Sequence, residues 1–178
     1  MMILFLVLIA CVSCFPENFR AVVKVDGKPV NVDFVLDLEK NTFVVTVGGV
    51  SHLGPTFSST VNLHDFNMQK LAFKRIDAGI CYVIHMDEDL AELSTRLHNM
   101  TSEIFAPHLP THVYRLTKTS MSNENLLAYA GSKIANFCRG YQTKYAHRVE
   151  DDEIHRRALL QQVSDNVVCG CDVIKMII

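Results

Sequence analysis

The feature that most constrains this chain is a series of short segments with a two-residue apolar period. In one of them Val30, Val32, Phe34 and Leu36 alternate with polar residues, as in a β-strand with one face in a core. Similar segments are found at 21–25, 43–47, 61–66, 70–74, 81–86 and 112–118. Turn sequences such as Asp26-Gly27 separate them. The sequence therefore predicts an antiparallel sheet.

Two segments have helical spacing instead. Between about residues 87 and 105 the apolar residues recur in steps of three, four and seven, at Leu90, Leu93, Leu97 and Ile104. A second helix is expected from Ser122 or Asn123 to Gly140. Its predicted apolar stripe consists of Leu127, Ala130, Ile134 and Phe137.

The N-terminus indicates the cellular compartment. Residues 1–12 are almost entirely apolar and are followed by Ser13 and Cys14. The run is shorter than the roughly 20 residues of a membrane span, so residues 1–14 are predicted to be a signal peptide and the protein to be secreted. The alternatives are an uncleaved anchor or a buried strand. Cleavage after Cys14 would leave an even number of the six cysteines. Asn99-Met100-Thr101 is then a glycosylation sequon.

Composition and motifs exclude several classes of function. The net charge of −2 and the lack of a basic patch with aromatic residues argue against binding of nucleic acid. Cys81 and His85 are poorly spaced on one strand for a thiol and its base, and no phosphate-binding or hydrolase motif is present. We therefore expect no enzyme activity, no cofactor, no metal site and no stable membrane span.

The C-terminal part divides into two segments. Residues 141–165 are polar and are interpreted as an extension that leaves the domain. Within it Arg156-Arg157 is either a processing site or a solvated charge run. Residues 166–178 are apolar, nearly uncharged and β-prone, as in segments that stack into cross-β structure. This tail is a candidate client for an exposed sheet edge, or else one more strand of the core. Cys169 and Cys171 can form a tight disulfide or link two chains.

The stretch Val61–Met86, VNLHDFNMQKLAFKRIDAGICYVIHM, resembles the BRICHOS family. It has a strand that ends in His-Asp-Phe, a turn, a second strand and then Cys-Tyr-Val-Ile. Ile134-Ala135-Asn136-Phe137-Cys138 at the end of a helix is similar to the segment around the family's second cysteine. The resemblance covers roughly residues 30–140, with residues 15–29 as a lead strand, and the secreted layout looks like that of the gastrokines.

The resemblance implies an α+β fold with a five-stranded antiparallel sheet flanked by two helices. It also implies a disulfide between Cys81 and Cys138, the alternative being two buried free thiols. In the chain-entropy model a loop of that size contributes about 4 kcal/mol. The family carries an acidic residue at the position of Asp65. Because burial disfavours the charged form of a carboxyl group, Asp65 is predicted to sense acidification; the alternative is a surface carboxylate bonded to a turn.

Family members act as chaperones that keep β-prone segments from forming amyloid. The resemblance thus implies that this chain binds such segments, including its own tail. The sheet face with Val30, Val32, Phe34 and Leu36 is the expected client site, uncovered when a helix moves. Two other functions remain open: a pro-domain that releases a C-terminal peptide after Arg157, and a secreted interaction module without chaperone activity. The layout is also compatible with a homo-oligomer.

Overall fold

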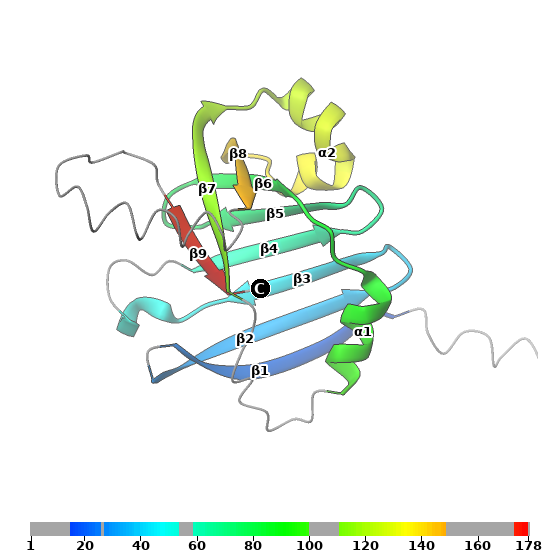
Figure 1. The fold of residues 1–178 in the computed structure, drawn as a ribbon, viewed down its shortest axis with the longest axis vertical. Coiled ribbons are helices and arrows are strands. Elements are labelled where there is room, and N and C mark those ends of the chain that lie inside the picture. Colours follow the sequence, from blue (N-terminus) through cyan, green and yellow to red (C-terminus); the bar gives the residue numbers. More distant parts are fainter. Residues whose placement is uncertain (1–14, 26, 54–58, 100–110, 149–172, 178) are drawn as a thin grey trace, which may run out of the picture.

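The structure is a computed structural model that describes residues 15–25, 27–53, 59–99, 111–148 and 173–177. In this part of the chain nine strands form one sheet, in the order β1-β2-β3-β4-β5-β6-β8-β7-β9 (Figure 1). The strands are β1 (Glu17–Val25), β2 (Lys28–Asp37), β3 (Thr42–Val47), β4 (Thr60–Asp65), β5 (Lys70–Arg75), β6 (Ile80–His85), β7 (Thr111–Ser120), β8 (Gln142–Arg148) and β9 (Val173–Ile177). The helices are η1 (Val50–Leu53), α1 (Leu90–His98) and α2 (Asn123–Phe137).

The predicted fold class, an α+β fold with a five-stranded antiparallel sheet flanked by two helices, is wrong. The described residues are mostly β, and the sheet is mixed because β6 and β8 pair in parallel. The lead strand joins the sheet as β1, which pairs antiparallel with β2 over its whole length, from Glu17 opposite Leu36 to Val25 opposite Lys28. At the other end β8, β7 and β9 extend the sheet beyond β6.

The strand β8 lies where the sequence predicted a polar extension. Gln142–Arg148 is inserted between β6 and β7, with Tyr82 opposite Lys144 and Leu116 opposite Ala146. Its backbone is therefore paired on both sides, which stabilises a strand of almost any side-chain composition. Among residues 142–147 of this strand Thr143 and Ala146 alone are buried, so the apolar alternation that would have revealed the strand is missing. Residues 149–165 of the predicted extension lie outside the described residues.

The sheet separates two apolar clusters. Residues directly opposite on neighbouring strands share a face, and one row across the sheet runs Leu36, Phe43, His64, Leu71 and Ile84. The apolar members of this row belong to the cluster that also contains Leu97 of α1, and we call this side the α1 face. On the other side Leu63, Ala72 and Val83 pack with Leu126, Ala130 and Ile134 of α2. We call it the α2 face.

The helix α1 is shorter than predicted. The Asp89 side chain caps its N-terminus by accepting hydrogen bonds from the backbone N–H groups of Ala91 and Glu92, at 2.7 and 3.0 Å. The helix ends at His98, with Asn99 as the C-cap. Leu90, Leu93 and Leu97 contact the core as the spacing predicted, whereas Ile104 lies outside the described residues.

The apolar stripe of α2 agrees with the prediction except at its first member, because Ala130 and Ile134 are buried and Phe137 packs against the same cluster. Leu126 is buried, but Leu127 is 53% exposed. The helix is interrupted at Gly131, whose φ of 74° and ψ of 176° are not helical. The buried residues Leu126, Ala130 and Ile134 keep a spacing of four across this interruption. The prediction failed at the first position because Leu126 and Leu127 are adjacent leucines and both fit the spacing to Ala130.

Candidate functional site

The described part of the β-prone tail, Val173–Ile177, lies at one edge of the sheet as β9. It pairs antiparallel with β7, from Thr111 opposite Ile177 to Arg115 opposite Val173, and Figure 1 shows it beside β7. These residues thus form one more strand of the sheet, which was the alternative interpretation. They also occupy a sheet edge, which is the position that a client strand would take. Cys169 and Cys171 lie outside the described residues.

The part of β7 that holds β9 extends beyond β8. The register of β7 with β8 includes Tyr114, Arg115, Leu116 and Ser120, with an irregularity between Leu116 and Ser120. The backbone of Thr111–Val113 is therefore paired with β9 but not with β8. Because Tyr114 and Arg115 pair with both β8 and β9, β9 lies on the side of β7 away from β8. Without β9 this side of β7 would be a free sheet edge, which is a template for another strand. In this structure β9 is the strand that pairs with it.

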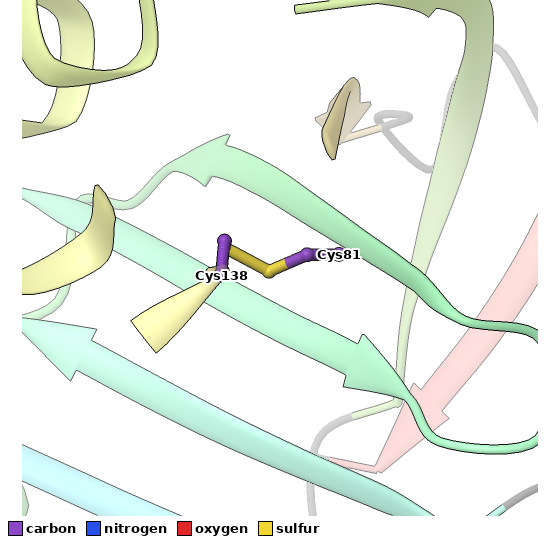
Figure 2. Close-up of a disulfide and its surroundings, with 2 residues drawn as sticks. All are labelled: Cys81 and Cys138. Atoms are coloured by element: carbon purple, nitrogen blue, oxygen red, sulfur yellow. A yellow bond between two sulfur atoms is a disulfide. The ribbon is translucent and has the colours of Figure 1, made fainter. Parts of the chain in front are cut away.

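The predicted disulfide between Cys81 and Cys138 is confirmed. Cys81 lies on β6 and Cys138 is the C-cap of α2, with Cα atoms 5.6 Å apart. Both residues are buried, and Figure 2 shows the bond between the end of α2 and the sheet. The disulfide therefore attaches α2 covalently to the α2 face.

Asp65 is buried at the end of β4, with 1% of its surface exposed. Its Oδ1 accepts a hydrogen bond from the backbone N–H of Asn67 at 3.1 Å and lies 3.6 Å from Lys133 Nζ of α2. Lys133 Nζ also donates to the carbonyl oxygen of Lys40 at 2.6 Å. Asp65 is thus bonded to a turn, as the alternative interpretation stated, but it is not at the surface. Its role as an acid sensor stays a prediction.

The four residues predicted to bind a client are all buried. Val30, Val32, Phe34 and Leu36 have 0–3% of their surfaces exposed, and they share one cluster with Leu97 of α1. A client could reach them only if the elements on the α1 face moved. The structure therefore places these residues in the core, and their role in binding stays a prediction.

Sequence reasoning missed two polar residues on the same face. Asn62 and His64 of β4 are 1% and 0% exposed, and Asn62 Oδ1 and His64 Nε2 have no hydrogen-bond partner. His64 Nδ1 lies 3.0 Å from Glu88 Oε2, just before α1. Alternation in Val61–Phe66 only places Asn62 and His64 on the face opposite Val61 and Leu63, so their burial follows from packing and not from the local sequence.

The polar contacts that hold α1 are exposed. His98 Nε2 lies 2.8 Å from Glu17 Oε2 of β1, and both side chains are well exposed. The His98 ring also packs edge-on against Phe19. A hydrogen bond to the carbonyl oxygen of Ser94, together with the nearby Glu17 carboxylate, raises the pKa of His98 above its ordinary value. The pair therefore attracts most strongly when His98 is protonated.

The other residues singled out in the sequence are the glycosylation residue Asn99, the processing residues Arg156 and Arg157, and the pair of Cys81 and His85. Asn99 is exposed at the C-cap of α1, where a glycan would be accessible. Arg156 and Arg157 lie outside the described residues. Cys81 is not a free thiol, and His85 contacts Asp87 at 3.0 Å and Lys70 at 3.3 Å. The thiol and base arrangement considered from the sequence is therefore not formed.

No protein-family model, curated protein or solved structure matches this chain. Among the described residues, neither helix has the length and apolar character needed to cross a membrane. The same residues contain no group of three or more His, Cys, Asp and Glu side chains that could hold a metal ion. The structural features that bear on function are therefore the strand β9, the two faces of the sheet and the disulfide.

Proposed function

We propose that this chain is a secreted, BRICHOS-like chaperone that holds β-prone segments as added strands, with its own tail as the first client. The observation that carries the proposal is the pairing of β9 with the end of β7. The disulfide between Cys81 and Cys138, which the resemblance implied, supports it. A buried disulfide also favours an oxidising compartment and hence secretion.

Strand addition explains how such a site could accept many clients. The added strand is held by backbone hydrogen bonds, which every sequence except proline can form. Val173–Ile177 is apolar except for Lys175 and contains no proline, so its β-propensity favours the extended form that the edge requires. Other segments of this composition would fit the same edge. Selectivity would then follow from β-propensity rather than from one side chain.

The tail and a client would compete for the same edge. A client must displace β9, which forms five backbone pairs with β7. Because β9 is part of the same chain, its effective concentration at the edge is high. A client at low concentration would therefore bind weakly, and a chain without the tail would bind it more strongly. This competition gives the proposal a direct test.

The test uses a chain that ends at Asp172 and a labelled synthetic peptide with the sequence of residues 173–178. We expect the shortened chain to bind the peptide and the full chain to bind it at least tenfold more weakly. Two N-methylated peptides serve as controls, one methylated at Ile174 and Met176 and the other at Lys175 and Ile177. In an antiparallel edge strand alternate residues point their N–H groups toward the neighbour. One methylated peptide should therefore lose binding, and the other should keep it.

If both methylated peptides bound as tightly as the unmethylated peptide, strand addition would be contradicted, because the backbone N–H groups on neither side of the peptide would then be needed for binding.

Mass spectrometry of the secreted product addresses the alternative function as a pro-domain. An intact bond between Arg157 and Ala158 would exclude release of the tail at that site.

A further inference from the structure

One lysine of the α2 face lies beside two aromatic rings. Lys74 of β5 is opposite Cys81 of β6, which belongs to the cluster on that face. The Nζ atom of Lys74 lies 4.2 Å from the centre of the Phe137 ring and 4.7 Å from the centre of the Tyr141 ring. Both rings pack against the same cluster, and Lys74 itself is half-buried. The amine is therefore held next to apolar surface.

The parts of the fold that build this site are attached to one another. Phe137 is the last residue of α2 and is followed by Cys138, whose disulfide to Cys81 joins this end of the helix to β6 (Figure 2). The backbone N–H of Tyr141 donates a hydrogen bond to the carbonyl oxygen of Cys138 at 3.0 Å. Because Lys74 is directly opposite Cys81, the amine and its two rings are in place without movement of any element.

Lys74 has a different environment from the lysines that face an acidic residue. Lys40 pairs with Asp37, and Lys133 pairs with Asp65, whereas Lys74 forms no ion pair within the part of the chain that the structure describes. Burial lowers the pKa of Lys74 below its ordinary value, because an ammonium group loses its interaction with water there. A larger fraction of the side chain is then the uncharged amine, which is the nucleophilic form.

The walls of the site indicate which class of reagent would react there. A reagent with an apolar chain would bury that chain against the two rings. An aldehyde reacts with an amine directly, whereas acylation requires an activated acid. The imine that an aldehyde forms can take up a proton and carry the positive charge again, so it keeps the attraction between a cation and the ring faces. An amide is neutral and would lose this attraction. The site therefore favours aldehydes.

We propose that Lys74 is a site of covalent modification by apolar aldehydes, whose chains pack against Phe137 and Tyr141. The lone pair of Nζ attacks the aldehyde carbon, a C–N bond forms, and one proton moves from the nitrogen to the carbonyl oxygen. The resulting hydroxyl group leaves as water with the second proton of the nitrogen, and a C=N bond forms. The products are one imine and one water molecule, and nothing is oxidised or reduced.

Lys70 provides a comparison within the same strand. It lies four residues before Lys74, so both side chains point to the α2 face. The Nζ atom of Lys70 lies above a single ring, that of Tyr129, at 4.3 Å, and 3.3 Å from His85 Nδ1. Lys70 thus has one ring and one polar neighbour in place of two rings. Apolar aldehydes are therefore expected to react with Lys74 in preference to Lys70.

This inference goes beyond the proposed function and does not depend on it. The site on the α2 face uses neither the edge at β7 nor an opening of the α1 face. A chain that failed to slow fibrils would still carry the reactive amine, and a chain without the reactive amine would still present the edge.

The test uses the full, disulfide-bonded chain and two aldehydes at equal low concentration, apolar hexanal and polar glyceraldehyde. Cyanoborohydride in the solution reduces each imine to a stable amine, and mass spectrometry of proteolytic fragments measures the label on each lysine. With hexanal we expect about fivefold more label on Lys74 than on Lys70. With glyceraldehyde, which gains less contact with the rings, we expect a ratio of about twofold. Equal label on the two lysines with hexanal would overturn the inference, as would the same ratio with both aldehydes.

Two matched variants test the role of the rings. Tyr141→Ala removes one ring beside Lys74 and admits water, so the initial rate at which hexanal labels Lys74 should fall about threefold. Tyr129→Ala removes the ring beside Lys70 instead and should leave the rate at Lys74 unchanged. An unchanged rate at Lys74 in folded Tyr141→Ala would also overturn the inference. The ratio in the wild-type chain requires no substitution, so it decides the question even where a variant does not fold.

Discussion

The two faces of the sheet are covered by helices that are attached in different ways. On the α2 face a disulfide, the pair of Lys133 with buried Asp65, and Lys74 stacked on Phe137 at 4.2 Å hold α2 in place. On the α1 face the nine-residue α1 packs its leucines on the core and forms an exposed pair between His98 and Glu17. The α1 face alone contains the unpartnered atoms of Asn62 and His64.

This difference indicates which side of the domain can change. Opening of the α2 face requires a covalent bond to break or a buried carboxylate to lose its cation. Opening of the α1 face exposes apolar surface but also returns two buried polar atoms to water or to a ligand. We therefore expect the α2 face to be the stable platform and the α1 face to open first.

Removal of the disulfide should have the largest effect. Replacing both Cys81 and Cys138 with alanine releases a loop with a sequence separation of 57, which is expected to lower the free energy of unfolding by about 4 kcal/mol in the chain-entropy model. Chemical denaturation under non-oxidising conditions measures it, and the reduced wild-type chain is the control. Equal stability of the oxidised wild type and the variant would show that α2 is held without the bond.

Loss of the buried carboxylate should rank second. Asp65→Ala removes the acceptor of the Asn67 N–H group and the carboxylate beside Lys133, which keeps its hydrogen bond to the Lys40 carbonyl oxygen. We expect the free energy of unfolding to fall by about 2 kcal/mol. The matched control is Asp33→Ala, which removes the partner of Arg20 on the exposed surface and should cause no measurable change. Equal effects of the two variants would contradict the special role of the α2 face.

A substitution at the kink of α2 should have a smaller effect. Gly131 has a φ of 74° and a ψ of 176°, a region that other residues avoid, and an added Cβ would lie 3.3 Å from Met68 Cγ. Gly131→Ala should lower the free energy of unfolding by about 1–2 kcal/mol. Gly27→Ala is the control, because its φ is also positive but nothing lies within 4 Å. A smaller loss at Gly131 than at Gly27 would contradict close packing at the kink.

The smallest effect is expected from the pair that holds α1. Because the folded state raises the pKa of His98, the protonated side chain stabilises the fold. This contribution is fully present below the ordinary histidine value of about 6.5 and is lost as the pH rises through the folded pKa. Amide exchange in α1, corrected for intrinsic rates, should therefore show more protection at pH 5.5 than at pH 8. Glu17→Gln should reduce this difference, and an unchanged difference would exclude the pair as its source.

Much of the fold was predictable because its strands alternate clearly. Val30, Val32, Phe34 and Leu36 do lie on one buried face, and Leu90, Leu93 and Leu97 contact the core. The strand β8 was not predictable in the same way, since its position depends on backbone pairing with β6 and β7 rather than on its side chains. The choice of Leu127 over Leu126 failed because both adjacent leucines fit the helical spacing to Ala130, at three and four residues.

The candidate site was only partly predictable. The tail was identified from its composition, but composition could not show which edge would hold it, because the edge depends on the order of strands in the sheet. The sequence predicted a strand at residues 61–66 and no role for Asn62 or His64. Their significance depends on burial and on missing hydrogen-bond partners, and both properties arise only when distant strands and helices pack around them.

The central claim is that this chain binds β-prone segments, and the most direct test is the formation of fibrils by a standard amyloid peptide. Fibril growth is followed with and without substoichiometric amounts of the full, disulfide-bonded chain at several pH values from 5 to 8. We predict a longer lag or slower growth. The amyloid peptide would bind as an added strand at the β7 edge or on the α1 face, and peptide or fibril ends bound in this way could not extend a fibril. Unchanged kinetics at every pH, with a chain shown to be folded, would contradict the account.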